Sequence, residues 1–251
     1  MLNEQLFEIV YDDKKIYGVH HRVENNILPG IVFLHGLAGD RVDSRRILVR
    51  LGRELQSMGF PSIRFDIIGT GISEGAFYDI TYSYWYDQIS FIVDNSVKEI
   101  WGYRPILIVA FSESGKIAIK IAKSKKQIVG LCLCNAIITS EKNQKNQNIK
   151  RLYKRGSKLV FDMGFGVWVN TEILKDNSEF IVTSKRDIPQ IPILSIYSKN
   201  DDLTQESSNF IRKHKFSEFK EVSNADHLFT NPVWEKQLFD TIQSWLFKLF
   251  K

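Results

Sequence analysis

The sequence predicts an α/β protein in which a mostly parallel sheet of eight strands is covered by helices on both faces. Short apolar runs with strand character alternate along the chain with longer segments whose apolar residues recur at helical spacing. This alternation is typical of a parallel sheet, because the chain must cross over through a helix to return in the same direction. A length of 251 residues and an apolar content of 43% suit one such domain with a single sizeable insertion.

Four strands and two helices are predicted in the N-terminal part of the chain. A hairpin of edge strands comes first, turned by Asp12-Asp13-Lys14. The next two strands are short apolar runs, and the helix between them places Ile47, Leu51 and Leu55 at helical spacing. The predicted strands are residues 7–11, 16–21, 31–35 and 62–66, and the predicted helices are residues 43–58 and 83–100.

The C-terminal part is predicted to add four strands and two helices. Three of these strands are apolar runs and the fourth is short, and the closing amphipathic helix begins at Pro232, a residue suited to a first helical turn. The predicted strands are residues 105–111, 128–135, 193–197 and 221–222, and the predicted helices are residues 114–123 and 232–250.

One strand-to-helix junction has the residues of a nucleophile elbow. In Ile106-Leu-Ile-Val-Ala-Phe-Ser112-Glu-Ser-Gly-Lys116, a buried strand stops at a serine and a helix follows. The turn is crowded, so the residues two before and two after the nucleophile must be small, and they are Ala110 and Ser114. A register with Ser114 as the nucleophile would place Lys116 where a small residue is needed. Ser112 is therefore the predicted nucleophile.

A carboxylate and a histidine follow the predicted nucleophile along the chain. Asp201 and Asp202 come after the strand at 193–197, and His227 lies in a loop after the last strand. An imidazole, with an unperturbed pKa of about 6.5, can take the proton of a serine hydroxyl near neutral pH and return it to a leaving alcohol. The order Ser, Asp, His is that of the α/β-hydrolase triad, unlike the orders in the chymotrypsin and subtilisin folds.

On these segments the chain resembles the serine α/β-hydrolases, and within them the small capped esterases of the cinnamoyl/feruloyl-esterase and serine-aminopeptidase-like group. Two upstream segments carry the resemblance as well, namely Gly30-Ile-Val-Phe-Leu-His35-Gly36-Leu37-Ala-Gly39 and Gly59-Phe-Pro-Ser-Ile-Arg-Phe-Asp66-Ile-Ile-Gly-Thr-Gly-Ile-Ser-Glu-Gly75. It extends from about residue 31 to the C-terminus and is weakest at 138–188. The family usually has arginine at the position of Ile68 and glycine at those of Ala110 and Ser114.

The resemblance implies an α/β-hydrolase fold with a small lid inserted between strands 6 and 7. The core domain is then residues 1–137 and 190–251, and the lid or cap is residues 138–189, a segment too long for a simple connection. Counting from Pro192 as in the family, Asp201 rather than Asp202 is the triad acid. Backbone N–H groups of Leu37 and Glu113 are the expected oxyanion hole. The side chain of Glu113 is expected to point away from it.

The predicted lid has a basic first half and an apolar second half. Seven lysines and arginines and no acidic residue lie in 142–158, which we expect to be a solvated surface helix or loop, the alternative being a patch for nucleic acid or anionic lipid. No nucleic-acid-binding motif accompanies it, so no nucleic-acid partner is expected. In 159–169, Phe161, Phe165 and Trp168 either line the substrate pocket over Ser112 or pack the lid onto the core.

The predicted function is therefore that of a serine carboxylic-ester hydrolase acting on small to medium acyl or aryl esters through an acyl-enzyme. A thioesterase or acyltransferase using the same triad is the alternative, and a non-catalytic partner-binding protein of this fold is a third. No metal-ligand spacing or phosphate-binding glycine loop occurs, and the mechanism needs no cofactor.

Location and assembly are constrained less strongly by the sequence. No apolar run approaches the roughly 20 residues needed to span a bilayer, and the N-terminus lacks a secretory signal, so a cytoplasmic location is expected. Cys132 and Cys134 are predicted to be buried thiols on one face of a strand. The aromatic closing helix has more apolar surface than one buried face needs, which is compatible with a homodimer or a membrane-surface contact; packing on the inner face is the simpler account for most of it.

Overall fold

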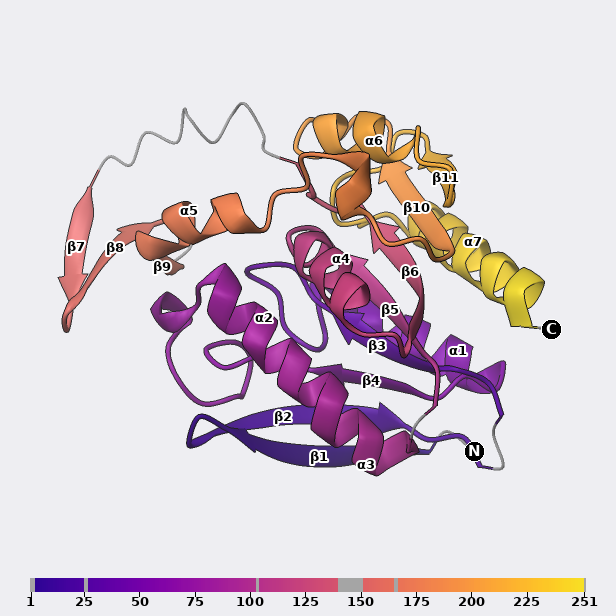
Figure 1. Cartoon of the computed structure of the whole chain (residues 1–251), viewed down its shortest axis with the longest axis horizontal. Helices are drawn as coiled ribbons and strands as arrows, with labels where there is room; N and C mark the ends of the chain where they lie inside the picture. The colour runs from indigo at the N-terminus through magenta and orange to yellow at the C-terminus, as the bar shows by residue number, and fades with distance from the viewer. Residues whose placement is uncertain (1–2, 25–26, 103, 140–150, 165–166, 251) are drawn as a thin grey trace.

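The chain is organised around one eight-stranded sheet, as Figure 1 shows. The computed structural model describes residues 3–24, 27–102, 104–139, 151–164 and 167–250. The spatial order of the strands is β1-β2-β4-β3-β5-β6-β10-β11. The pairs β1–β2 and β2–β4 are antiparallel, and all the other pairs are parallel. The strands are β1 Glu4–Tyr11, β2 Lys14–His21, β3 Gly30–Leu34, β4 Ser62–Phe65, β5 Ile106–Phe111, β6 Ile128–Cys134, β10 Ile193–Ser198 and β11 Ser217–Val222. The predicted mostly parallel eight-stranded sheet is confirmed.

Helices cover both faces of this sheet and bury alternate residues of its strands. In β5, Leu107 and Val109 pack with α1 and α7, whereas Ile106 and Ile108 pack with α2 and α4 on the other face. The helices are α1 Ile47–Ser57, α2 Tyr82–Phe91, α3 Val97–Trp101, α4 Ser114–Ser124, α5 Glu172–Asp176, α6 Gln205–Ile211 and α7 Pro232–Phe250. The short helix α6 is polar along most of its length and was not predicted.

Two of the predicted helices differ in detail from the expectation. The helix expected over 43–58 starts only at Ile47, because Asp43, Arg45 and Arg46 have φ values of 57°, 50° and 62°, which no right-handed helix allows. The helix expected over 83–100 is one continuous helical segment in which a π-helical stretch, Ile92–Ser96, joins α2 to α3.

The insertion between β6 and β10 contains a small antiparallel sheet of its own, drawn to one side of the molecule in Figure 1. Its strands are β7 Leu152–Arg155, β8 Lys158–Asp162 and β9 Trp168–Asn170. The expectation of a helix or loop was wrong for the described part of the basic stretch, since β7 and β8 form a hairpin turned at Gly156, where φ is +59°. The many charged residues of this segment favoured a solvated helix or loop over a strand in the sequence-based prediction. The first part of the stretch, 142–150, lies outside the described residues.

Two further expectations concern buried side chains. Cys132 and Cys134 are free, buried thiols with their sulfur atoms 3.7 Å apart, as predicted. In α7, Phe239 and Trp245 are buried, and Phe250 packs against Phe60. Its largest exposed apolar side chains are Val233 and Phe247. Within the described part of the chain, no helix is both long and apolar enough to cross a bilayer.

Candidate active site

The junction between β5 and α4 has the geometry of a nucleophile elbow. Ser112 has φ = +54°, a strained conformation for a residue other than glycine, which costs on the order of 1–3 kcal/mol and commonly marks a functional position. Ser114 is fully buried, and its hydroxyl accepts a hydrogen bond from the Phe111 N–H at 3.1 Å. A Cβ at Gly115 would lie 2.6 Å from the Cβ of Ala136, so only glycine fits there. The hydroxyl of Ser114 is thus used in holding the turn, while that of Ser112 is presented at its tip.

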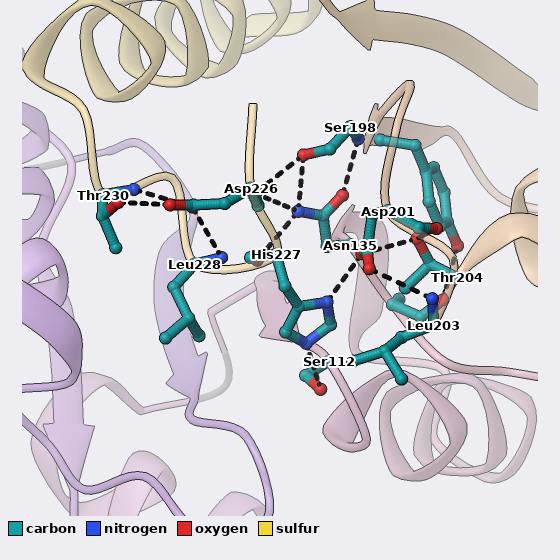
Figure 2. A network of polar contacts seen from close by, with 12 residues as sticks. Ser112, Asn135, Ser198, Asp201, Leu203, Thr204, Asp226, His227, Leu228 and Thr230 are labelled. Atoms are coloured by element: carbon teal, nitrogen blue, oxygen red, sulfur yellow. Dashed lines mark hydrogen bonds and ion pairs between the residues drawn. The ribbon is translucent and has the colours of Figure 1, made fainter. Parts of the chain in front are cut away.

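The structure brings Ser112, His227 and Asp201 into one hydrogen-bonded chain, although they lie after three different strands (Figure 2). The Oγ atom of Ser112 is 2.9 Å from Nε2 of His227, and Nδ1 of the same ring is 2.6 Å from Oδ2 of Asp201. This is the arrangement in which an imidazole can take a proton from a serine while a carboxylate orients it. Asp202 is exposed, and no hydrogen bond joins it to another residue in the described part of the chain.

Asp201 is held as a carboxylate by its neighbours. Burial alone would raise its pKa, but hydrogen bonds from His227, from the Thr204 hydroxyl at 2.8 Å and from the Leu203 N–H at 3.2 Å outweigh it and leave the pKa below the ordinary value. The side chain of Asp201 is 4% exposed, whereas that of His227 is 20% exposed. The acid is therefore enclosed and ionised, and the imidazole remains accessible.

The loop that carries His227 is fixed by an asparagine that sequence reasoning missed. Asn135, directly after β6, donates from Nδ2 to the carbonyl of His227 and to the Ser198 hydroxyl, both at 2.8 Å. Its Oδ1 accepts the Ser198 N–H at 2.7 Å. Asp226 caps the next turn by accepting the N–H groups of Leu228 and Thr230 (Figure 2). The only sequence signal for Asn135 is its place directly after a buried strand.

The two backbone N–H groups predicted to form an oxyanion hole, those of Leu37 and Glu113, have no hydrogen-bond acceptor in the described part of the chain. Gly36 lies against the nucleophile, because a Cβ there would be 3.3 Å from the Cβ of Ser112. The loop of Leu37 is in turn anchored by Asp66, which accepts the Arg41 N–H at 2.6 Å and forms an ion pair with its guanidinium.

The side chain of Glu113 turns into a buried ion pair. Its Oε2 lies 2.5 Å from Nζ of Lys116, which is 0% exposed, and accepts a hydrogen bond from Tyr82 at 2.6 Å. Burial and the adjacent Glu113 raise the pKa of Tyr82 well above its ordinary value, so the phenol keeps the proton that it donates. Lys116 also donates to Oδ1 of Asn177 in the insertion, at 2.7 Å. This Glu113–Lys116 network therefore joins the elbow to the insertion.

The three aromatic residues predicted to line a pocket are placed differently from one another. Phe161 is 5% exposed and packs in the apolar cluster beneath the insertion. Trp168 is partly buried and lies edge-on to Tyr153, with Arg155 over its ring at 5.0 Å. Phe165 lies outside the described residues. The alternative in which these aromatics pack the insertion onto the core accounts for Phe161.

Comparison with known structures gives the same fold at low sequence identity. Est1E from Butyrivibrio proteoclasticus, with ferulic acid bound, has a TM-score of 0.81 at 17% identity, covering 96% of this chain and 98% of its own. Mouse alpha/beta hydrolase domain-containing protein 10 has a TM-score of 0.76 at 16% identity, with 98% and 99% covered. A soluble variant of monoglyceride lipase from Saccharomyces cerevisiae, in complex with a substrate analogue, has a TM-score of 0.76 at 16% identity, with 99% and 96% covered.

The family itself follows from the sequence match. No curated protein sequence matches the chain. The family model for serine aminopeptidase S33 hydrolases matches residues 29–187, which include the Leu37 loop, the elbow and most of the insertion. The chain therefore belongs to the serine aminopeptidase (S33) family of α/β serine hydrolases.

Proposed function

We propose that the chain is a carboxylic-ester hydrolase that works through an acyl-enzyme on Ser112. One observation carries the proposal, namely the chain of contacts from Ser112 through His227 to Asp201 at 2.9 and 2.6 Å. Membership of a serine hydrolase family makes hydrolysis the expected reaction. The Est1E structure with ferulic acid bound and the lipase structure with a substrate analogue support an ester as the substrate class.

In the proposed first half-reaction, the Ser112 hydroxyl attacks the ester carbonyl while His227 takes its proton. The negative charge on the tetrahedral intermediate is stabilised by the N–H groups of Leu37 and Glu113, and Asp201 stabilises the imidazolium. The intermediate then collapses, the ester C–O bond breaks, and the proton passes from His227 to the leaving alcohol. In the second half-reaction, water gives a proton to His227 and attacks the acyl carbonyl. The bond from the acyl carbon to the Ser112 Oγ then breaks, His227 returns the proton to Oγ, and the carboxylic acid leaves.

The Glu113–Lys116 network favours this function over a purely structural role for the fold. A carboxylate beside an oxyanion hole opposes the charge that forms there, unless a cation neutralises it and turns it away. Lys116 does both at 2.5 Å, and it does so at the cost of burying an ammonium group. Small to medium acyl or aryl esters are the proposed substrates. A thioesterase or an acyltransferase would use the same Ser112, His227 and Asp201.

A fluorophosphonate probe with intact-mass detection tests the proposal. We expect one adduct on the wild-type chain and none on Ser112→Ala. Ser244→Ala is the matched control, because it removes an exposed serine hydroxyl on α7, outside the elbow, and should still be labelled. Absence of an adduct on folded wild type, or an adduct that persists in Ser112→Ala, contradicts the proposal. A panel of p-nitrophenyl esters and acyl thioesters then distinguishes ester hydrolysis from the thioester alternative.

A further inference from the structure

A group of cations lies at the amino edge of the central sheet, at the other end of its strands from Ser112. Three segments contribute to it, and each immediately precedes a parallel strand, β6, β10 or β11. Since Ser112, Asp201 and His227 follow the carboxyl ends of strands, the length of β10, six residues at about 3.3 Å each, separates the two regions by roughly 20 Å. The basic side chains are Lys123, Lys125, Lys126, Lys185, Arg186, Lys213 and Lys215.

These cations surround two adjoining hollows, which we call the cationic groove. One, of about 360 Å³, is lined by Lys185, Arg186, Lys213, His214 and Lys215 together with the apolar Ile188 and Phe216. The other, of about 460 Å³, is lined by the lysines that precede β6. Arg186, Ile188 and Gln190 line both hollows, so the two are continuous. Both hollows are shallow and open to solvent, and the volume of each suits a small ligand.

Most of the cations in the groove have no counter-ion within the protein. In the described residues, no carboxylate pairs with Lys126, Lys185, Arg186, Lys213 or Lys215, whereas Lys123 and Lys125 pair with Asp187 and Asp94 at its rim. Lys185 donates instead to the backbone carbonyl of Lys213 at 3.3 Å. Gathering like charges in one concave place costs stability and creates a positive potential that concentrates anions.

His214 is a second, independent sign of a ligand. It lines the groove, is only 7% exposed, and its Nδ1 has no hydrogen-bond partner in the part of the chain that the structure describes. Buried polar atoms are normally satisfied, and the exceptions often mark a missing ligand or water. Burial and the neighbouring Lys185 and Lys215 lower the pKa of His214, so the ring is neutral at pH 7 and one of its nitrogens is an available donor.

We propose that the cationic groove binds a small molecule carrying two or more phosphate groups. The unpaired cations extend over both hollows, and neutralising them takes more negative charge than one phosphate supplies. The lysines and Arg186 would contact the phosphate oxygens, and the ring of His214, which lines the same hollow, would lie beside them. Ile188 and Phe216 offer apolar contact to the rest of the molecule. The inference does not depend on the proposed esterase activity.

Isothermal titration of the full chain with inorganic tripolyphosphate and with ATP, at about 0.15 M salt so that exposed charges are screened, tests the proposal. We expect one saturable site, weakened about tenfold or more in Lys213→Gln/Lys215→Gln. The charge-matched control Lys236→Gln/Lys248→Gln, on α7, should bind as the wild type does. Tighter binding of ATP than of tripolyphosphate supports the proposal and indicates that Ile188 and Phe216 contact the nucleoside part of the ligand. Equal affinity supports it for the phosphates alone.

The pKa of His214, measured by nuclear magnetic resonance, provides a second readout that reports on binding in the groove itself. Tripolyphosphate should raise the pKa of His214, because a bound anion stabilises the imidazolium, and the signal is identified by its loss in His214→Gln. Absence of saturable binding, equal weakening in the α7 control, or binding of anionic vesicles but neither soluble probe overturns the proposal. Both lysine variants should hydrolyse p-nitrophenyl esters at the wild-type rate.

Discussion

The two edges of the central sheet carry ionisable groups in opposite states. At the carboxyl edge, Asp201 is bonded to His227 and the buried Lys116 is paired with Glu113. At the amino edge, Lys213 and Lys215 have no carboxylate partner among the described residues. At the carboxyl edge the ionisable groups are therefore bonded to one another within the protein. At the amino edge these two lysines are left unpaired in those residues and produce a positive potential.

The difference is what the two proposed functions require of the two edges. Groups that take part in a reaction must be held in place before the substrate arrives, so their hydrogen bonds are made within the protein. Groups that only bind a charged ligand leave their bonding capacity for that ligand. A parallel sheet keeps the two apart, because its strands place the loops that follow them and the loops that precede them at opposite ends. Changes at one edge should therefore leave the other edge unaffected.

The largest effect is expected at the carboxyl edge, for Asp201→Asn. The amide would favour the wrong tautomer of His227 and could not stabilise an imidazolium, so kcat/KM for a p-nitrophenyl ester should fall by about 10³–10⁴-fold. Asp202→Asn is the matched control, since the exposed Asp202 makes no hydrogen bond to His227 in the described residues, and its activity should stay within about twofold of wild type. Comparable losses in the two variants would show that Asp201 is not the triad acid. Tripolyphosphate binding at the amino edge should be unchanged in both.

The residues of the carboxyl edge were largely predictable because they obey local constraints. A buried strand that ends at a serine between small residues is compatible with few structures, and it identified Ser112 before any contact was known. The polar residues after later strands could be matched to the same edge by topology alone. In contrast, Asn135 holds partners 63 and 92 residues away, and no local pattern marks such contacts.

Neither the cationic groove nor the β7–β8 hairpin of the insertion was predicted from the sequence. The groove is assembled from three segments that span about ninety residues, from Lys123 to Lys215, and each alone is an ordinary lysine-rich turn. In the insertion, the charges of residues 151–158 favoured a solvated helix or loop. Pairing with β8, which buries Val160 and Phe161, instead holds that segment as a strand.

A second, smaller effect is expected where the elbow meets the insertion, for Lys116→Met. The substitution leaves the Glu113 carboxylate partly buried without its cation, so the free energy of unfolding should fall by about 3–5 kcal/mol. The loss of neutralisation beside the oxyanion hole should also lower kcat by about tenfold in the chain that remains folded. Urea unfolding and steady-state hydrolysis measure the two effects.

The double variant Glu113→Gln/Lys116→Met separates charge from packing in that network. It removes both charges and keeps side chains of similar volume, so it should recover most of the stability and of kcat. If the double variant is no better than Lys116→Met, the ammonium group matters for its contacts with Asn177 and Tyr82 rather than for Glu113. Either way, binding at the amino edge should not change.

The smallest effect is expected for Asn135, which touches no reacting atom and acts only through the loop of His227. Asn135→Ala removes the hydrogen bonds to the His227 carbonyl and to Ser198, and a lost bond of this kind costs about 1–3 kcal/mol when its partner stays buried. Because His227 would sample positions out of line with Ser112, kcat should fall about tenfold with KM nearly unchanged.

Asn135 also has φ = +42°, a conformation that alanine disfavours and glycine accepts, so Asn135→Gly distinguishes the two roles of the residue. If the side-chain hydrogen bonds position His227, glycine should recover stability relative to alanine without recovering kcat. Recovery of kcat by glycine would mean that only the backbone conformation matters, and that the loop of His227 is held by its other contacts. In that case the position of His227 would not depend on the side-chain hydrogen bonds of Asn135. The contrast between the two edges would then be smaller than the structure indicates.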